Sequence, residues 1–260
     1  MPDTPTSPPP SARPSADRAV DIARWLGLLA AVLQLSWLLE SVVGSPLPSR
    51  TAYVSELMAS DQPTAWLFRG ADTVAGMALL TAVLLSWGVV RRWRRSTQRG
   101  ERPSRLLGLA HLGLGVFGVA MVVDAVLTPM SCAPSIEVAC AQAELTGQVP
   151  LTHQLHSLVS SLSAMGALVG LVSAAVWAWS RRRRATVHVG ALVAVALGYV
   201  IVTVWVLLEM ASATPGHELS GRIGLDVLGW SQRAGITLSA LGLALVATLP
   251  TLRSDAGRTA

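Results

Sequence analysis

Six long apolar stretches, each bounded by charge or proline, constrain this chain more than any other feature. A bilayer core of about 30 Å takes about 20 apolar residues per helix, so each stretch is long enough to cross it. The stretches group as three hairpins and leave no room for a soluble domain. They predict an all-α polytopic membrane protein with one six-helix domain at 22–250, its helices being 22–43, 65–90, 106–128, 154–180, 187–210 and 226–250.

The composition and the two tails agree with this class. Hydrophobic residues make up 52% of the chain and charged residues 13%, about half of what a soluble protein carries. Residues 1–21 are rich in proline and serine and cannot bury a core, so we expect a disordered cytoplasmic tail there. A secretory signal is the alternative, but the apolar run that follows is too long for one and contains Gln34 and Glu40. Residues 251–260 are expected to form a second cytoplasmic tail.

The arginines predict the orientation in the membrane. All 20 basic residues are arginine, and 16 of them flank the six stretches on one side, against Arg50 and Arg222 on the other. Short cytoplasmic loops retain positive charge, so both termini should be cytoplasmic in a protein of the cell membrane. These arginines lie flush with the bilayer, which makes membrane lipids the expected partners and excludes nucleic acid. The sequence does not indicate the oligomeric state.

Both cysteines fall in one predicted external loop, "PMSCAPSIEVAC". Cys132 and Cys140 are close enough in sequence to form a disulfide, and the outer compartment permits one. The alternative is a metal site that combines these thiols with His153, although their spacing matches no familiar zinc pattern.

Ionisable residues gather near the outer ends of the predicted helices, where each is costly in lipid. Acids end the first, third and fifth helices, and polar residues open the second, fourth and sixth: Glu40, Asp124 and Glu209, then Arg69, Asp72, His153, His156, Gln232 and Arg233. Carboxylates at helix C-termini and cations at helix N-termini each lie at the unfavourable end of the helix dipole, so something else must compensate their charge. Either the residues form interhelical ion pairs that lock the bundle, or they line an outward-facing polar pocket.

Helical spacing directs both histidines of the fourth helix toward the bundle interior. Steps of three and four residues trace one stripe along the helix, whose residues are polar at first and then small: His153, His156, Ser160, Ser163, Ala167 and Gly170. Gly166 and Gly170 form a small-xxx-small motif that favours close helix packing. His111 lies in another small-residue stripe and is expected to be a hydrogen-bonded core residue.

Several short motifs also resemble a known family. "YVSELMASDQPTAWLFRGAD", "DAVLTPMSC", "THQLHSLVSSLSAMG" and "GWSQRAGI" look like segments of the domain-of-unknown-function 998 family of six-helix bacterial membrane proteins. The Ser-Glu-Leu loop also faintly resembles the DRAM-like membrane proteins. The first resemblance covers about residues 22–250 and implies the six-helix fold without an established activity. It points to these residues: Ser55, Glu56, Asp124, His153, His156, Gln232 and Arg233.

Three functions fit the polar residues. The favoured one is binding of an anionic lipid head group or small ligand by Arg69, Arg233 and the histidines, with no cofactor and no catalysis. The first alternative is a metal-dependent hydrolase in which His153, His156 and Asp124 hold zinc, with Glu56 or Glu40 as base. The second is a proton-coupled transporter that uses the same carboxylates and imidazoles.

Overall fold

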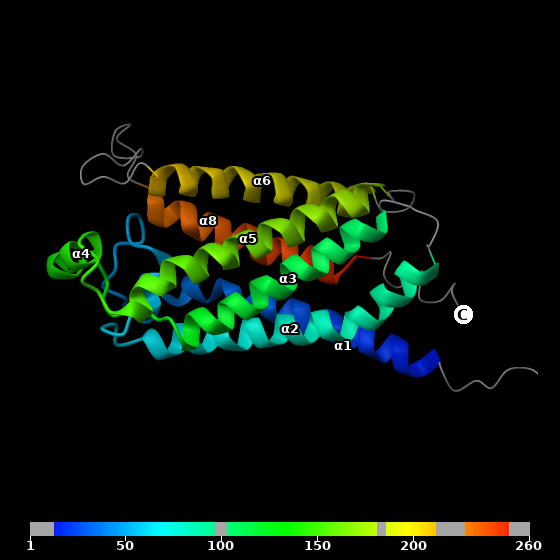
Figure 1. The fold of residues 1–260 in the computed structure, drawn as a ribbon, viewed down its shortest axis with the longest axis horizontal. Helices are drawn as coiled ribbons and strands as arrows, with labels where there is room; N and C mark the ends of the chain where they lie inside the picture. Colours follow the sequence, from blue (N-terminus) through cyan, green and yellow to red (C-terminus); the bar gives the residue numbers. More distant parts are fainter. Residues whose placement is uncertain (1–12, 97–102, 181–185, 212–226, 250–260) are drawn as a thin grey trace, which may run out of the picture.

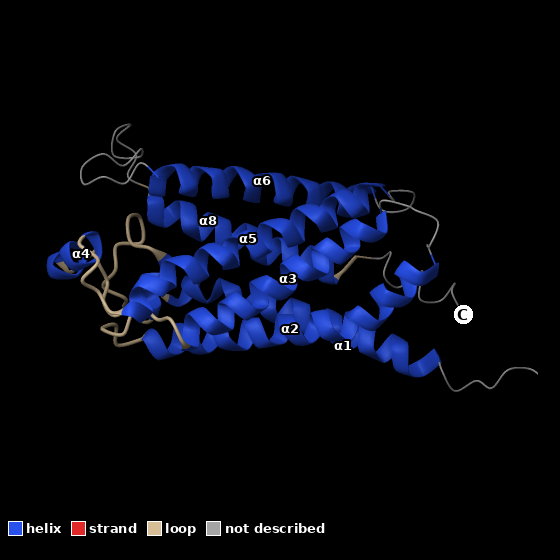
Figure 2. Cartoon of the chain, in the orientation of Figure 1, coloured by secondary structure: helices blue, strands red, loops and turns tan. Residues whose placement is uncertain are grey.

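The computed structural model of the protein describes residues 13–96, 103–180, 186–211 and 227–249, and their regular structure is entirely helical (Figure 2). The predicted all-α class is confirmed. The long helices lie alongside one another in a bundle (Figure 1). They are α1 Arg13–Gln34, α2 Ala65–Ser96, α3 Pro103–Val126, α5 Leu151–Ser180, α6 Thr186–Ala211 and α8 Leu228–Ala247.

Within the described residues, five segments are long and apolar enough to cross a membrane: Arg18–Leu39, Ala65–Gly88, Arg105–Val126, Leu151–Ser180 and Val187–Glu209. Helix α8, which carries Gln232 and Arg233 in its first turns, is not among them. Large apolar side chains face outward along the bundle, and Leu84 and Ile201 are 73% and 68% exposed. Such surfaces suit contact with lipid, and they identify a multi-pass membrane protein.

The boundaries of α1 differ most from the prediction. The helix begins at Arg13, inside the segment expected to be disordered, and the 3-10 helix η1 Leu35–Leu39 replaces its last expected turns. Pro14 falls in the first turn, where its missing N–H would have had no helical partner. The other long helices begin and end within six residues of the predicted positions. Residues 1–12 and 250–260, which hold most of the predicted tails, lie outside the described residues.

One end of the bundle carries ordered connections, and we call it the loop end. It comprises residues 40–64, with the 3-10 helix η2 Val54–Met58, and residues 127–150, with helix α4 Val138–Leu145. Figure 1 shows α4 beyond this end, whereas α1 begins and α8 finishes at the opposite end. Neither short helix was predicted, because each is too brief to produce a clear hydrophobic period. Leu57, Phe68 and Met130 pack together beneath these connections.

The six long helices form a closed ring. Each packs against the next long helix along the chain, and α8 returns to pack against α1 as well as α6. This closure places residues from the first and last helices side by side. It also encloses the centre of the loop end, where all six helices contribute side chains to one cavity.

Helices α3 and α5 approach each other most closely, because glycine removes the side chains between them. A Cβ atom added to Gly166 would lie 2.6 Å from the backbone nitrogen of Phe117, and one added to Gly170 would lie 2.9 Å from a methyl carbon of Leu114. Neither separation is tolerated between real atoms. The small-xxx-small motif therefore faces α3, as its sequence indicates. This crossing brings the last turn of α3 against the first turns of α5.

Candidate ligand-binding cavity

Asp124 of α3 and His156 of α5 form a buried hydrogen-bonded pair, and two hydroxyl groups bond to the carboxylate. The Nδ1 atom of His156 lies 2.8 Å from Oδ1 of Asp124 and 3.2 Å from the carbonyl oxygen of Thr128. Since both partners are acceptors, Nδ1 carries a proton. Thr128 donates its hydroxyl to Oδ1 (3.1 Å), and Ser160 donates to Oδ2 (2.8 Å). The Oγ atom of Ser160 also lies 3.3 Å from Nε2 of His156.

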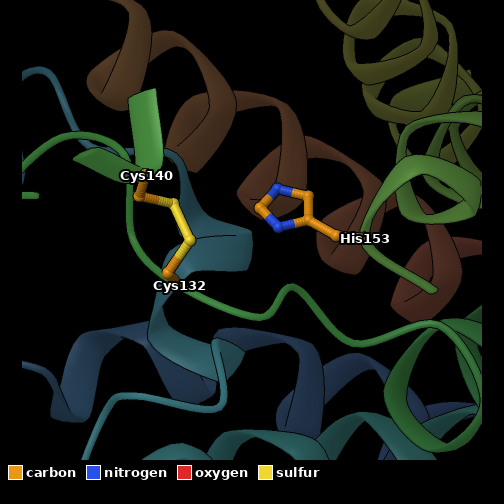
Figure 3. Close-up of side chains that lie close together, drawn as sticks. All are labelled: Cys132, Cys140 and His153. Carbon is orange, nitrogen blue, oxygen red and sulfur yellow. A yellow bond between two sulfur atoms is a disulfide. The ribbon is translucent and has the colours of Figure 1, made fainter. Parts of the chain in front are cut away.

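His153 faces a different neighbourhood, although it is only three residues away. Its Nδ1 accepts a hydrogen bond from the backbone N–H of Ser131 (3.2 Å) and lies 2.9 Å from that residue's Oγ. The ring lies beside a disulfide between Cys132 and Cys140, whose Cα atoms are 6.0 Å apart (Figure 3). The structure therefore separates the two histidines, one into the interior and one under the external loop.

Arg233 of α8 pairs with Glu40, which follows η1, across the junction that closes the ring. Its Nε and Nη2 atoms donate to the two carboxylate oxygens of Glu40, at 3.0 and 2.5 Å. Its Nη1 donates to the carbonyl oxygens of Ser49, Ala52 and Gly229, at 2.8 to 3.0 Å. These bonds engage every nitrogen of the buried guanidinium.

Arg69 and Glu56 hold the connections of the loop end. Arg69 donates Nε to the carbonyl oxygen of Met58 (2.7 Å) and Nη2 to the hydroxyl of Ser60 (2.9 Å). Glu56 accepts hydrogen bonds from the backbone and hydroxyl of Ser135, at 3.0 and 2.5 Å, and from the backbone of Tyr53 (2.9 Å). Burial raises the pKa of Glu56 above its ordinary value, although the bonds from Ser135 and Tyr53 oppose the rise.

A cavity of about 350 Å³ lies inside the loop end of the ring. Asp72, Asp124, His156 and Gln232 of the predicted site line it, whereas Glu56, Arg69, His153 and Arg233 do not. Much of the remaining wall is aromatic or thioether: Trp37, Tyr53, Phe68, Phe117, Tyr199, Met58, Met121, Met130 and Met165. The structure thus brings half of the predicted set together, including both aspartates but neither guanidinium.

Asp72 differs from the other ionisable residues at this end. Asp124 pairs with His156, and Glu40 pairs with Arg233. Asp72 lines the cavity, and within the described part of the chain its carboxylate accepts no hydrogen bond and forms no ion pair. The like charge of Asp124 acts on it. Its carboxylate is therefore available to a cation or a hydrogen-bond donor in the cavity.

Two contributors to this site were not recognised in the sequence. Glu144 of α4 lines the cavity and places Oε1 3.8 Å from Nε2 of His153. Burial raises the pKa of the Glu144 carboxyl, and His156 lowers it. Nothing in its loop sequence signals this position. Ser160 lies on the predicted polar stripe, four residues after His156, and that helical spacing could have identified it as a partner of the pair.

The chemistry open to this site is limited in two ways. Among the described residues, one group of histidine, cysteine and acidic side chains has the proximity a metal requires, and it is Cys132, Cys140 and His153, without His156 or Asp124. Ser160, His156 and Asp124 have the composition of a hydrolase triad. Ser160, however, lies inside α5, where the backbone N–H groups are already engaged in the helix and cannot stabilise an oxyanion.

The chain was compared with protein families, curated proteins and solved structures. No curated protein and no solved structure is significantly similar to it. The resemblance to the DRAM-like proteins stays a prediction. Residues 26–249 match the family described as Protein of unknown function (DUF998). Because this match extends from α1 to the end of the described part of the chain after α8, the protein belongs to the DUF998 family.

Proposed function

We propose that the protein binds a small amphipathic ligand in the loop-end cavity, with an amine at the polar end of the ligand. The observation that carries this proposal is the carboxylate of Asp72, which lines the cavity without a partner among the described residues. An unpartnered carboxylate in largely apolar surroundings costs free energy. An ammonium group would supply both the opposite charge and the missing hydrogen-bond donors.

The rest of the lining suits the apolar body of such a ligand. The cavity volume of about 350 Å³ falls within the range of small-molecule sites, roughly 300 to 1,000 Å³. Phe68 on α2, the helix of Asp72, and Phe117 and Met121 on α3, the helix of Asp124, supply apolar wall. Aromatic faces also attract cations, which favours an ammonium over a neutral polar group.

The charge of the lining argues against an anionic head group. That hypothesis needed Arg69 and Arg233 to face the ligand. Both guanidiniums instead bond to Glu40, to backbone carbonyls and to Ser60, and neither residue lines the cavity. The ionisable groups that do line it are three carboxylates and one imidazole. An anion would therefore meet like charge without a compensating arginine.

Binding without catalysis fits the polar residues better than either alternative hypothesis. Zinc hydrolysis would require His153, His156 and Asp124 to converge, and they do not form a group in the described chain. For proton-coupled transport, no observation on the described residues supports a path across the membrane. Both hypotheses stay predictions.

The test measures thermal unfolding of the full-length protein in lipid nanodiscs with three amphiphiles of equal chain length, an amine, an alcohol and a phosphate. We expect the amine to raise the unfolding temperature most, and Asp72→Asn to abolish that rise. Glu137→Gln is the matched control, because Glu137 is an exposed carboxylate at the same end with no capping bond to α4. Stabilisation by the phosphate alone, or an unchanged amine effect in Asp72→Asn, would contradict the proposal.

We also propose that six helices span the cell membrane, with both termini in the cytoplasm. Helix α8 supports the sixth span because it closes the ring between α1 and α6. The arginine distribution supports the orientation. In a background without Cys132 and Cys140, an impermeant thiol reagent on intact cells should label Gln148→Cys but not Arg94→Cys or Arg182→Cys. The opposite labelling pattern would reverse the orientation.

A further inference from the structure

His153 has a buried nitrogen atom that the protein leaves without a partner. The residue is 1% exposed, and its Nε2 forms no hydrogen bond within the described part of the chain. Oε1 of Glu144 lies 3.8 Å from this nitrogen, which is beyond hydrogen-bonding distance. Figure 3 shows the imidazole ring beside the disulfide of Cys132 and Cys140. A polar atom buried in this way calls for a function or a ligand.

The two sulfur atoms and a ring nitrogen of His153 lie within 4.8 Å of one another. Donors around one tetrahedral Zn²⁺ are roughly 3.3 to 3.8 Å apart, given bonds of about 2.0 to 2.3 Å. The three side chains come from the loop after α3, from α4 and from the first turn of α5, so the fold assembles them without help from sequence spacing. Cys132, Cys140 and His153 are therefore close enough together to hold a metal ion once the bond between the two sulfur atoms is broken.

We propose that reduction of the Cys132–Cys140 disulfide creates a Zn²⁺ site formed by both thiolates and Nε2 of His153. A dithiol reductant supplies the two electrons: its thiolates exchange with the disulfide, the reductant leaves as a disulfide, and Cys132 and Cys140 become thiols. Zn²⁺ then binds as both thiols release their protons to water. The fourth coordination position is left to water or to Glu144, which lies next to Nε2.

The hydrogen bonds around His153 can accommodate this change. Nδ1 now accepts from the backbone N–H of Ser131, so the neutral ring carries its proton on Nε2. Metal binding at Nε2 moves the proton to Nδ1, where Oγ of Ser131, at 2.9 Å, can accept it. A ligating histidine usually donates its other N–H in this way.

The experiment uses the full-length protein in detergent, either oxidised or reduced and freed of reductant, titrated with Co²⁺ as a spectroscopic substitute for Zn²⁺. We expect the reduced protein to bind one Co²⁺ with a thiolate charge-transfer band, and the oxidised protein to show none. His153→Ala should weaken binding by at least about 100-fold, since even loss of an outer-shell partner costs 10- to 100-fold. His188→Ala is the matched control, because His188 bonds to the carbonyl oxygen of Leu245, away from the loop end.

Three results would overturn the proposal. The first is a reduced protein that keeps its helical circular dichroism but shows no thiolate band with Co²⁺. The second is equal binding by oxidised and reduced protein, which would place the ion elsewhere. The third is undiminished binding by His153→Ala. Competition by Zn²⁺ against the bound Co²⁺ then tests the metal itself, and failure of Zn²⁺ to displace it would contradict the assignment to zinc.

Discussion

Replacing Arg233 with methionine tests whether the Glu40–Arg233 pair holds the ring closed. Glu40 is 7% exposed and Arg233 is 3% exposed, and the guanidinium donates to both carboxylate oxygens and to three backbone carbonyls. Arg233→Met leaves the carboxylate of Glu40 buried without its cation. It also removes the donor from the carbonyl oxygens of Ser49, Ala52 and Gly229.

The expected loss of unfolding free energy is about 3–5 kcal/mol, the cost of removing one partner of a buried ion pair. Arg69→Met is the matched control. Among the described residues, half-buried Arg69 donates to a carbonyl and a hydroxyl and not to a carboxylate. Arg69→Met leaves no buried carboxylate without its cation, so we expect the unfolding free energy to fall by only about 1–2 kcal/mol.

A double variant separates two contributions to the destabilisation: the unpaired charge of Glu40 and the lost hydrogen bonds to the carbonyls. In Arg233→Met with Glu40→Gln the buried residue is neutral, so the destabilisation should be smaller than the sum of the two single variants by at least about 1 kcal/mol. The assay is unfolding of purified protein in mixed micelles by increasing dodecyl sulfate, followed by circular dichroism. Arg233→Met within about 1 kcal/mol of the parent, or strict additivity in the double variant, would refute the reasoning.

Three further predictions concern packing, the disulfide and pH. Gly166→Val should lower the unfolding free energy by about 1–3 kcal/mol or more, because even a Cβ atom at this position meets the α3 backbone. Gly190→Val, which has open space around it, should cost less in the same unfolding assay. Cys132→Ser with Cys140→Ser should cost at most about 2–3 kcal/mol and keep the helical circular dichroism, because the disulfide closes a short loop outside the bundle. Burial raises the pKa of Glu56, so the folded state holds this proton more tightly than the unfolded state, and the contribution of Glu56 to stability should fall as pH rises above the ordinary value of 4.5. The difference in unfolding free energy between the parent and Glu56→Gln, measured at several pH values, should show that fall, and a difference independent of pH would contradict it.

Much of the fold could be predicted from hydrophobic run length. A helix that crosses lipid must satisfy its backbone internally and stay apolar over its whole length, so its sequence signal is strong. The long helices consequently fall close to the predicted ranges. His111 is likewise hydrogen-bonded in the bundle as expected, to Ser86 and to the carbonyl oxygen of Leu107. Helices η2 and α4 follow from packing at the loop end, which no local pattern records.

The pairing of the ionisable residues could be predicted only in part. The sequence indicates that acids and bases share one level of the bundle, and interhelical pairs form there. Glu40 and Arg69, the acid and the base of the first hairpin, do not pair with each other. Glu40 pairs with Arg233, 193 residues away, because α8 closes the ring against α1. Such a contact depends on the order of helices around the ring, which hydrophobic periodicity does not determine.

The orientations of His153 and His156 show the same limit. Three residues along a helix turn it by about 300°, so the two side chains point about 60° apart. They therefore lie on neighbouring faces of the helix. The close approach of α3 directs His156 to Asp124, while the loop after α3 takes His153. The stripe therefore indicated that both imidazoles are buried but could not assign their partners. Arg69 shows a further limit, because its guanidinium reaches back to the loop before its own helix.

Isothermal titration of the full-length protein in nanodiscs with a soluble amphipathic amine tests the proposed function most directly. We predict saturable binding of one amine per chain. In Asp72→Asn the dissociation constant should rise roughly 10- to 150-fold, which corresponds to the loss of about 1.5–3 kcal/mol for a charge-assisted hydrogen bond. Glu137→Gln should bind like the parent. The absence of saturable binding, or an Asp72→Asn variant that binds the amine as tightly as the parent, would contradict the assignment of the cavity.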